Sequence, residues 1–440
     1  MKIYNNKDVY TASMERVEYM FKEFDNVLVA FSGGKDSGVL LNLCYQYAKD
    51  NNMLSKLSMY HLDYEAQYQY TTDYVEDCML NKYKEIKKYW LCLPIAAQCA
   101  VSMYQSYWTP WDKEKEEIWV RKMPNNSLII NENNVEFEFK KNDEDYKVQE
   151  KFNEWFAEKN GSTVVAIGLR SDESLNRYRA VSSSNEMLKE FKYKNKQWIN
   201  ANEMFCKAYP IYDWTAQDIW IANAKFGFSY NKLYDLFYQA GLSIDQMRVA
   251  SPFNDCAITT LKVYKEVEPN TWGKLVGRVN GVNFAGIYGG TMAMGWKSIK
   301  LPKGHTWKSY MEFLLSTLPE EIRENYLKKL EASKKSWLVG GAMDKKTIEE
   351  LENEGAPLIR TGKISNRGAK DKEVIQFEDY LDDTTVTDFK RIPTYKRMCI
   401  CIMKNDHLCK YMGFAMTKKE TEKRQKTIEK YKSIIKGSGL

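Results

Sequence analysis

Apolar residues in the first part of the chain follow two alternating spacings. Residues 26–31 and 57–62 are short apolar runs, and the first is rich in β-branched residues, as in buried strands. Between them, from Gly38 onward, apolar residues recur every three or four positions, which is the spacing of an amphipathic helix. A strand, a helix and a strand within about 40 residues predict a βαβ unit with parallel strands. The pattern therefore favours an α/β fold built on a parallel sheet.

The same patterns divide the chain in two. We place a boundary between residues 250 and 266, with an α/β domain at 1–255 and a smaller, mainly α domain at 256–440. The stretch 103–123 is dense in aromatic residues and predicts a loop or lid, whereas 128–139 predicts a β-hairpin inserted into the first domain. The other predicted elements are helices at 11–24, 71–90, 143–159, 210–239, 306–329, 344–354 and 417–435, strands at 90–94 and 163–167, glycine-rich turns at 273–295, and a short β segment at 398–403.

Composition narrows the class of protein. The 440 residues contain no run of about 18 apolar residues, so no membrane span is expected. A net charge of +6 is mildly basic and does not by itself indicate nucleic acid binding. Nine cysteines lie without a regular framework, and no signal-like segment precedes them, which predicts a cytoplasmic protein with reduced thiols.

The turn between the first predicted strand and its helix reads Ser-Gly-Gly-Lys-Asp-Ser at residues 32–37. A strand that feeds a glycine turn and a helix aims backbone N–H groups at one point, where the helix dipole favours an anion. The glycines let the backbone approach a phosphate closely, and the lysine adds a mobile positive charge. The aspartate would repel phosphates unless it helps to hold Mg²⁺ or caps the helix. The predicted phosphate-binding residues are Ser32, Gly33, Gly34, Lys35, Asp36 and Ser37.

Asp63 directly follows the predicted strand at 57–62. Ligands of open parallel sheets lie outside the carboxyl ends of the strands, so this carboxylate is placed to hydrogen-bond a ribose or to hold a metal. Its alternative roles are to cap a helix or to lie in solvent within a loop.

A charged string, Gly-Leu-Arg-Ser-Asp-Glu-Ser-Leu-Asn-Arg, follows the predicted strand at 163–167. Arg170 and Arg177 are fork-shaped donors suited to phosphate or sulfate. Asp172 and Glu173 could orient these arginines or begin the next helix. The alternative is a cluster of surface salt bridges.

These stretches resemble a known family. Residues 32–37 after their apolar strand resemble the pyrophosphate-binding loop of the ATP pyrophosphatase superfamily. Residues 168–177 resemble the arginine-acidic motif of sulfate adenylyltransferase small subunits and phosphoadenosine phosphosulfate (PAPS) reductases. Residues 209–220 resemble the Pro-x-x-Asp-Trp-Thr-x-x-Asp-x-Trp signature of the same family, which we interpret as mainly structural. The resemblance implies an adenine nucleotide alpha hydrolase-like, Rossmann-like sheet with helices on both faces that binds ATP or PAPS with Mg²⁺.

The later part of the chain also resembles known proteins. Residues 277–285 and 395–402 resemble a prophage- and plasmid-borne branch with a C-terminal domain of unknown function, which includes the immunoglobulin-binding regulator A proteins. A ParB-like protein is commonly encoded beside members of that branch. The resemblance therefore implies a ParB-like partner.

The cysteines depart from the reductase pattern. A PAPS reductase needs a catalytic cysteine in a Glu-Cys-Gly context near its C-terminus, and no such string occurs here. Cys399, Cys401 and Cys409 lie near His407, but zinc sites usually show Cys-x₂₋₄-Cys pairs, so buried structural cysteines are favoured over a metal site. The sequence therefore predicts that the chain does not reduce PAPS.

Three functions follow from these observations. In the first, the loop holds the pyrophosphate of Mg·ATP, and Lys35, Arg170 and Arg177 stabilise attack on the α-phosphorus, which adenylates an acceptor and releases pyrophosphate. In the second, the chain only binds ATP or PAPS and regulates a partner protein. In the third, it transfers sulfur to nucleic acid, which the balanced charge does not favour.

Overall fold

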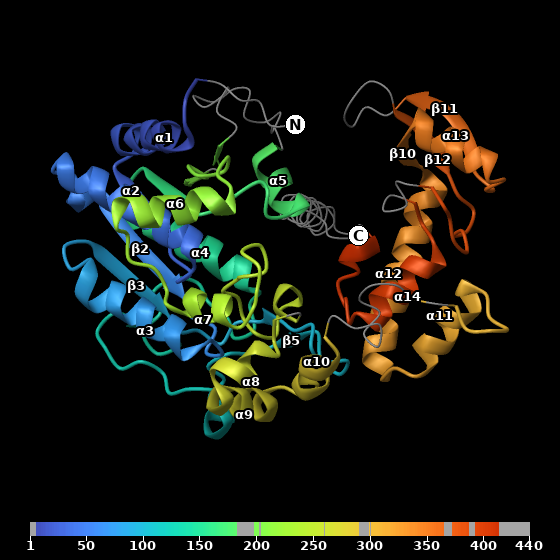
Figure 1. Ribbon diagram of the computed structural model, residues 1–440. Coiled ribbons are helices and arrows are strands. Elements are labelled where there is room, and N and C mark those ends of the chain that lie inside the picture. Colours follow the sequence, from blue (N-terminus) through green and yellow to red (C-terminus); the bar gives the residue numbers. More distant parts are fainter. Residues whose placement is uncertain are drawn as a thin grey trace, which may run out of the picture. The chain divides into compact units, whose positions relative to one another are not determined.

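The computed structural model describes residues 6–182, 198–201, 204–258, 260–289, 299, 301–364, 372–386 and 392–412. Its contacts divide the chain into two units (Figure 1). Unit 1 comprises Met1–Cys99 and Tyr107–Gly286, and unit 2 comprises Ala100–Ser106 and Ile287–Leu440. This division lies further along the chain than the predicted boundary at 250–266, because helices up to Arg278 pack onto unit 1.

Unit 1 is built on a seven-stranded sheet in the order β6-β3-β2-β1-β7-β9-β8. Neighbouring strands are parallel except for the antiparallel pair β8 and β9. The sheet thus confirms the predicted α/β class. The strands are β1 (Asn26–Ala30), β2 (Leu57–Leu62), β3 (Lys87–Leu91), β6 (Ile129–Ile130), β7 (Thr163–Ile167), β8 (Ile199–Ala201) and β9 (Cys206–Ala208); β4 (Ala97–Gln98) and β5 (Tyr107–Trp108) form a separate pair.

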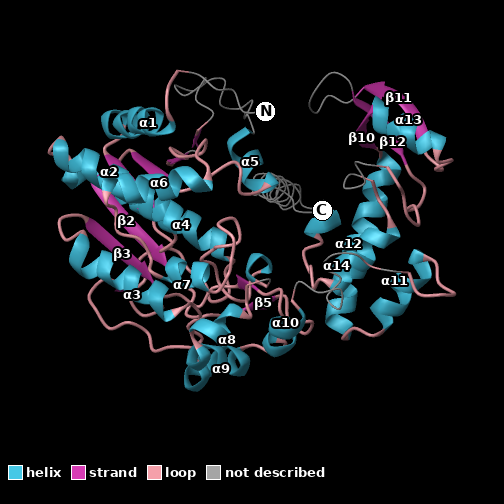
Figure 2. Cartoon of the chain, viewed as in Figure 1, coloured by secondary structure: helices cyan, strands magenta, loops and turns pink. Residues whose placement is uncertain are grey.

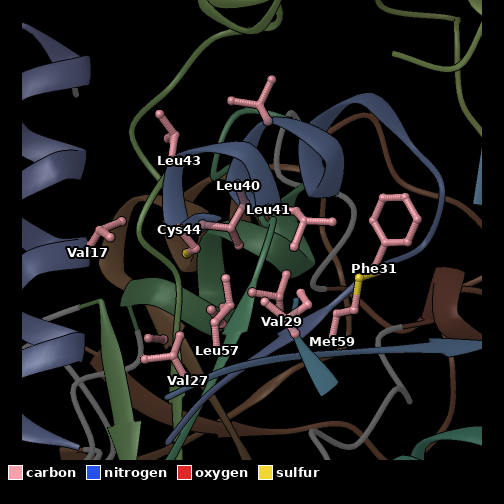
Figure 3. Packing of buried hydrophobic residues seen from close by; sticks show 14 of the residues in the cluster. Val17, Val27, Val29, Phe31, Leu40, Leu41, Leu43, Cys44, Leu57 and Met59 are labelled. Atoms are coloured by element: carbon pink, nitrogen blue, oxygen red, sulfur yellow. The ribbon is translucent and has the colours of Figure 1, made fainter. Parts of the chain in front are cut away.

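Helices cover both faces of this sheet (Figure 2). Val27 and Val29 of β1 pack against α1 and α2 (Figure 3). Leu28, between them in the sequence, packs with α4 on the opposite face. This alternation is the period of two that a strand buried on both faces imposes. The helices of unit 1 are α1 (Val9–Glu23), α2 (Lys35–Asp50), α3 (Gln69–Asp77), α4 (Asp145–Asn160), α5 (Leu175–Ser182), α6 (Ala216–Phe226), α7 (Leu233–Gln239), α8 (Val263–Val267), α9 (Pro269–Arg278) and α10 (Val282–Tyr288), whose last residues pass into unit 2.

Most elements with a clear period lie where the sequence predicts them. The predicted strands at 57–62 and 163–167 coincide with β2 and β7, and the helices predicted at 11–24 and 143–159 are α1 and α4 within two residues. The helical stretch predicted at 210–239 consists of α6 and α7. The helix α6 begins at a capping box formed by Thr215 and Asp218. It ends at Gly227, whose positive φ of 64° would strain any residue with a side chain.

The predicted hairpin at 128–139 is wrong. Only Ile129–Ile130 forms a strand, and it pairs in parallel with β3 at the edge of the main sheet. The alternating apolar residues Val135, Phe137 and Phe139 pack instead into the core beneath α4. Their alternation indicated one buried face, which a packed loop can satisfy as well as a strand.

Two further predictions in unit 1 need correction. The helix predicted at 71–90 ends much earlier: α3 passes into a π-helical turn, Cys78–Lys82, and β3 begins at Lys87. Within 273–289, the predicted turns are largely the helices α9 and α10. A Cβ on Gly286 would lie 2.3 Å from the Trp272 ring, so this glycine permits close packing of the two helices rather than a turn.

Unit 2 has a three-stranded antiparallel sheet, β10-β12-β11, beside helices. The helix predicted at 306–329 consists of two helices that are separated by Pro319, and the helix predicted at 344–354 is α13. The predicted helix at 417–435 and part of the glycine stretch lie outside the described residues. The elements are α11 (Trp307–Ser316), α12 (Glu320–Val339), β10 (Gly341–Asp344), α13 (Lys345–Asn353), β11 (Ile359–Ile364), β12 (Lys372–Gln376) and α14 (Tyr395–Met403).

The short β segment predicted at 398–403 is wrong, because these residues belong to α14. Thr394 caps the helix by accepting a hydrogen bond from the N–H of Arg397. Cys399 and Cys401 are buried in the unit 2 core, as is Cys409. In the part of the chain that the structure describes, no group of three or more His, Cys, Asp or Glu side chains could hold a metal, and no helix is long and apolar enough to cross a membrane.

A fully buried ion pair fastens α9 to the sheet of unit 1. Glu65, just after β2, accepts hydrogen bonds from Arg278 Nε at 2.8 Å and Arg278 Nη2 at 3.0 Å. The same carboxylate accepts the backbone N–H groups of Trp111 and Val120. One buried carboxylate therefore holds both the aromatic segment and the last helices of unit 1.

We predict that Arg278→Leu destabilises unit 1 by about 3–5 kcal/mol, because it leaves the Glu65 carboxylate buried without a counter-ion. Urea unfolding followed by tryptophan fluorescence measures the loss, and hydrogen exchange should accelerate at the Trp111 and Val120 amides. The control is Arg360→Leu, since Arg360 is 44% exposed and pairs with glutamates at the surface. Equal stabilities of the two variants would contradict the role assigned to this pair.

Candidate functional site

The glycine turn lies where the strand order reverses. From β1 the chain builds β2 and β3 on one side, whereas β7 and β9 lie on the other. The turn at 32–37 follows β1, and the charged string at 168–177 follows β7, its immediate neighbour. Open α/β sheets bind their ligands at such a switch point, outside the carboxyl ends of the strands. The two sequence motifs are therefore brought together at the position that the fold reserves for a ligand.

Hydroxyl groups hold the turn in shape. Ser32 Oγ and Ser37 Oγ lie 2.9 Å apart, and Ser37 Oγ accepts the Ser32 N–H at 3.2 Å. Ser32 Oγ also accepts the N–H of Gly34 at 3.3 Å. Gly34 is the N-cap of α2 and has no side chain to cap the helix. The first turn of α2 thus begins directly at the loop, with its dipole directed at the ligand side.

Two glycines make this close arrangement possible. Gly33 has a positive φ of 75°, and a Cβ there would lie 2.8 Å from a methyl group of Val75. A Cβ on Gly168 would lie 2.8 Å from the backbone nitrogen of Ser37 and 2.9 Å from the carbonyl carbon of Asp36. Gly168 therefore lets the end of β7 touch the start of α2.

Arg170 joins the two strand ends through ion pairs. Its Nε bonds to Asp36 Oδ1, and its Nη1 donates to Asp172 Oδ1 at 2.6 Å. Lys35 Nζ lies 3.1 Å from the other Asp36 oxygen. Burial alone would lower the pKa of Arg170, but the adjacent carboxylates of Asp36 and Asp172 raise it. Arg170 is only 4% exposed and its charge is taken up by carboxylates, so it positions Asp36 rather than facing the ligand space.

Glu173 lies between two arginines. Arg177 Nη1 is 2.6 Å from Glu173 Oε2, and Arg248 Nε is 4.0 Å from Glu173 Oε1. Arg248 Nη2 also donates to the Glu173 backbone oxygen at 3.2 Å. The side chains of Arg177 and Arg248 are 41% and 35% exposed. Both guanidinium groups therefore remain accessible from the ligand side.

A cavity of about 70 Å³ lies between the loop and these arginines. Loop residues, Gly168, Glu173, Arg177 and Arg248 line it. Its volume suits an oxyanion and is well below the roughly 300–1,000 Å³ of pockets that enclose a whole small molecule. A larger hollow of about 290 Å³ lies at the outer sheet edge, beside β6 and near Lys88 and Tyr89 of β3, and none of the 32–37 loop residues lines it.

Two residues that the sequence analysis did not single out hold the loop from the other side. Tyr234 OH accepts the N–H of Lys35 at 3.0 Å, and Asn231 Nδ2 donates to the carbonyl oxygen of Gly33 at 3.1 Å. Burial raises the pKa of the Tyr234 hydroxyl, so it stays neutral. Both lie in the stretch 228–239, whose helical pattern indicated a core face and gave no sign of contact with the loop.

Asp63 does not join the other predicted residues. It is fully buried, and its carboxylate accepts from Trp90 Nε1 at 2.8 Å, from the Glu65 N–H at 2.9 Å and from Arg121. Burial would raise the pKa of this carboxyl, but Arg121 and His61 lower it. The structure thus gives Asp63 protein partners in place of a ribose or a metal.

The aromatic signature at 209–220 is structural, as interpreted from the sequence. Trp214 is fully buried, and its Nε1 donates to Ser13 Oγ of α1 at 2.7 Å. Arg16 of α1 pairs with Asp213 through two hydrogen bonds of 2.8 and 2.6 Å. These contacts dock α1 onto the start of α6.

The sheet, its switch point and the glycine loop define the chain as an open α/β protein with a candidate anion-binding loop after the first strand. A family model described as a phosphoadenosine phosphosulfate reductase domain matches residues 26–240. A second, described as a domain of unknown function (DUF3440), matches residues 241–423. The uncharacterized protein YbdN of Escherichia coli K12 is 32% identical over 442 residues, which cover 98% of this chain and 95% of that protein. The chain belongs to the family that joins a PAPS reductase domain to DUF3440.

Solved structures resemble the chain only weakly. The PAPS reductase of Candida auris, crystallised as a phosphate complex, has 13% identity and a TM-score of 0.30, over 55% of this chain and 88% of that one. The tRNA thiolase NcsA of Methanococcus maripaludis has 12% identity and a TM-score of 0.31, over 64% of this chain and 84% of that one.

We predict that Gly168→Ala weakens pyrophosphate binding by about 10- to 100-fold, because forcing a methyl group into a packed contact costs about 1–3 kcal/mol. Isothermal titration calorimetry measures the change. Gly277→Ala is the matched control, since a Cβ there has nothing within 4 Å and lies inside α9. If both variants bind pyrophosphate like the parent chain, the close contact between β7 and α2 does not shape the site.

Proposed function

We propose that the chain binds Mg·ATP and cleaves it at the α-phosphorus, transferring the adenylyl group to an acceptor and releasing pyrophosphate. The observation that carries the proposal is the junction of the 32–37 loop with α2 at the switch point, beside a cavity lined by Lys35, Arg177 and Arg248. Backbone N–H groups, a helix dipole and these cations provide complementary charge for a pyrophosphate leaving group.

Each residue has a distinct part in this proposal. Ser32, Ser37 and the glycines shape the loop around the β- and γ-phosphates. Lys35 supplies the charge nearest the leaving group, and Arg177 stabilises charge at the α-phosphorus side. Arg170 holds Asp36 and so fixes the start of α2. The reaction needs no nucleophile from the protein, because the acceptor itself attacks the phosphorus.

The residues present fit Mg²⁺ at one point. Asp36 lines the cavity and offers carboxylate oxygens, and Mg²⁺ usually takes one or two carboxylates together with substrate phosphates. Its oxygens are paired with Arg170 and Lys35. Asp36 would hold the metal, with Arg170 keeping its carboxylate in place and Lys35 next to it at the phosphates. The metal would neutralise phosphate charge when bound.

Reduction of PAPS is not part of the proposal. The sequence contains no Glu-Cys-Gly string, and the described cysteines nearest the C-terminus are buried in unit 2. Burial raises the pKa of the Cys399 thiol to about 12, which keeps it protonated near neutral pH. Binding of ATP or PAPS without turnover, with regulation of a ParB-like partner, stays the second prediction from the family resemblance, and sulfur transfer to nucleic acid stays the third.

We predict that Lys35→Ala lowers pyrophosphate release by at least about 100-fold, the usual loss when one group that stabilises a transition state is removed. The full chain is incubated with Mg²⁺ and α-labelled ATP, with and without sulfate or single-stranded nucleic acid, and AMP-containing products and pyrophosphate are quantified. Lys49→Ala serves as the control, because Lys49 is exposed at the far end of α2.

Two results would contradict the proposal that the chain is an ATP-cleaving enzyme. Tight binding of Mg·ATP without any pyrophosphate release, also after a ParB-like protein is added, would favour the regulator. Equal activity of Lys35→Ala and Lys49→Ala would remove the loop from the reaction.

A further inference from the structure

At the mouth of the loop cavity, positively charged groups outnumber the carboxylate that they face. One carboxylate, Glu173, faces two guanidinium groups, with Arg177 at 2.6 Å and Arg248 at 4.0 Å. A carboxylate can neutralise one of the two, so one positive charge remains at the mouth. Each guanidinium carries five N–H donors. At hydrogen-bond distance, Glu173 contacts one nitrogen of Arg177 and one nitrogen of Arg248. Donors and charge are thus left over on the cavity side.

Deeper in the site, carboxylates neutralise the positive charges of the side chains more fully than at the mouth. Lys35 pairs with Asp36, and Arg170 is enclosed by Asp36 and Asp172. These groups belong to the loop and to the join between the strand ends. The two arginines at the mouth come instead from α5 and from the segment after α7. The cavity lining therefore has two cationic regions on different elements.

Arg248 lies beyond the part of the chain that matches a PAPS reductase domain, which ends at residue 240, and within the DUF3440 match. It nevertheless packs in unit 1 and lines the cavity together with the loop. The beginning of the DUF3440 segment thus supplies a side chain to a site that the first domain otherwise builds.

We propose that Arg248 and Arg177 form a second anion subsite, which holds an anionic group of the acceptor beside the pyrophosphate loop. The proposal rests on the proposed function for the identity of the acceptor, and it names that acceptor as a molecule with a carboxylate or a tetrahedral oxyanion. In the free chain the Glu173 carboxylate occupies the place of that group. When an anion arrives, it takes the spare donors of both arginines in a forked, charge-assisted geometry.

The two anion subsites also imply an order of bonds formed and broken in the reaction. An oxygen of the acceptor, held at the mouth, bonds to the α-phosphorus, and the bond from that phosphorus to the bridging oxygen breaks. The electron pair leaves with pyrophosphate, which remains on the loop. An in-line displacement requires the attacking group and the leaving group on opposite sides of the phosphorus, and two separate anion subsites in one cavity would meet that requirement.

Calorimetry with inorganic sulfate as probe tests the subsite. The full chain is first saturated with Mg·pyrophosphate, which covers the loop, and is then titrated with sulfate. We expect Arg248→Gln to weaken sulfate binding by about tenfold or more, the loss of one charge-assisted contact, while pyrophosphate affinity changes by less than about threefold. Arg248→Lys, which keeps the charge but not the fork, should fall between. Arg360→Gln is the matched control, because Arg360 pairs with glutamates on unit 2.

The variant Glu173→Gln should change the sulfate affinity in the opposite direction to Arg248→Gln. Removing the competing carboxylate frees both arginines, so sulfate should bind more tightly than to the parent chain. A purely structural role for Glu173 predicts no gain. Circular dichroism of each variant checks that the fold is kept.

Several outcomes would overturn the subsite. These are no sulfate binding once pyrophosphate is bound, displacement of pyrophosphate by sulfate, or equal losses of both ligands in Arg248→Gln. If the parent chain binds no pyrophosphate, the proposed function fails, and titration of the unloaded protein still decides the subsite. Sulfate binding lost in Arg248→Gln and kept in Lys35→Ala supports it, and the reverse contradicts it.

Discussion

The buried guanidinium of Arg170 is the interaction on which the site depends. It bonds to Asp36 at the start of α2 and to Asp172 beyond β7, and so joins the two strand ends on either side of the switch point. Without it, Asp36 would keep only the ammonium group of Lys35 as a counter-ion, and the two strand ends would lose the ion pairs that join them. This ion pair requires a glycine at position 168, because the end of β7 lies against the start of α2. A Cβ on Gly168 would lie only 2.8 Å from the backbone nitrogen of Ser37. The contacts of Arg170 thus both position the loop and neutralise the carboxylates beside it.

The sequence predicted this region well where local chemistry decides structure. A glycine turn between a strand and a helix has few alternatives, and the strand at 163–167 was recognisable from its apolar run. The roles of single charges were harder to predict. Arg170 and Asp63 carry charges that suit a ligand, but both are buried with protein partners that lie far away in the sequence. Periodicity reports which side is buried, and it does not report the partner across a core.

The same limit explains the errors elsewhere. The alternation at 135–139 indicated one buried face, which a packed loop under α4 provides. The short β segment predicted at 398–403 is part of the helix α14, in which Cys399 and Cys401 are buried. Tyr234 and Arg248 were missed because their contacts with the loop and with Glu173 join residues that are far apart in the sequence. Through Arg248 and the Arg278–Glu65 pair, the beginning of the DUF3440 segment becomes part of the α/β unit.

The central claim is that ATP is broken at the α-phosphorus while pyrophosphate stays on the loop. Phosphorus NMR of Mg·ATP with the full chain and candidate acceptors identifies the broken bond directly, because each product has its own resonance. The account predicts pyrophosphate together with an adenylylated product or AMP. ADP with inorganic phosphate would contradict it, since that pair shows attack at the γ-phosphorus.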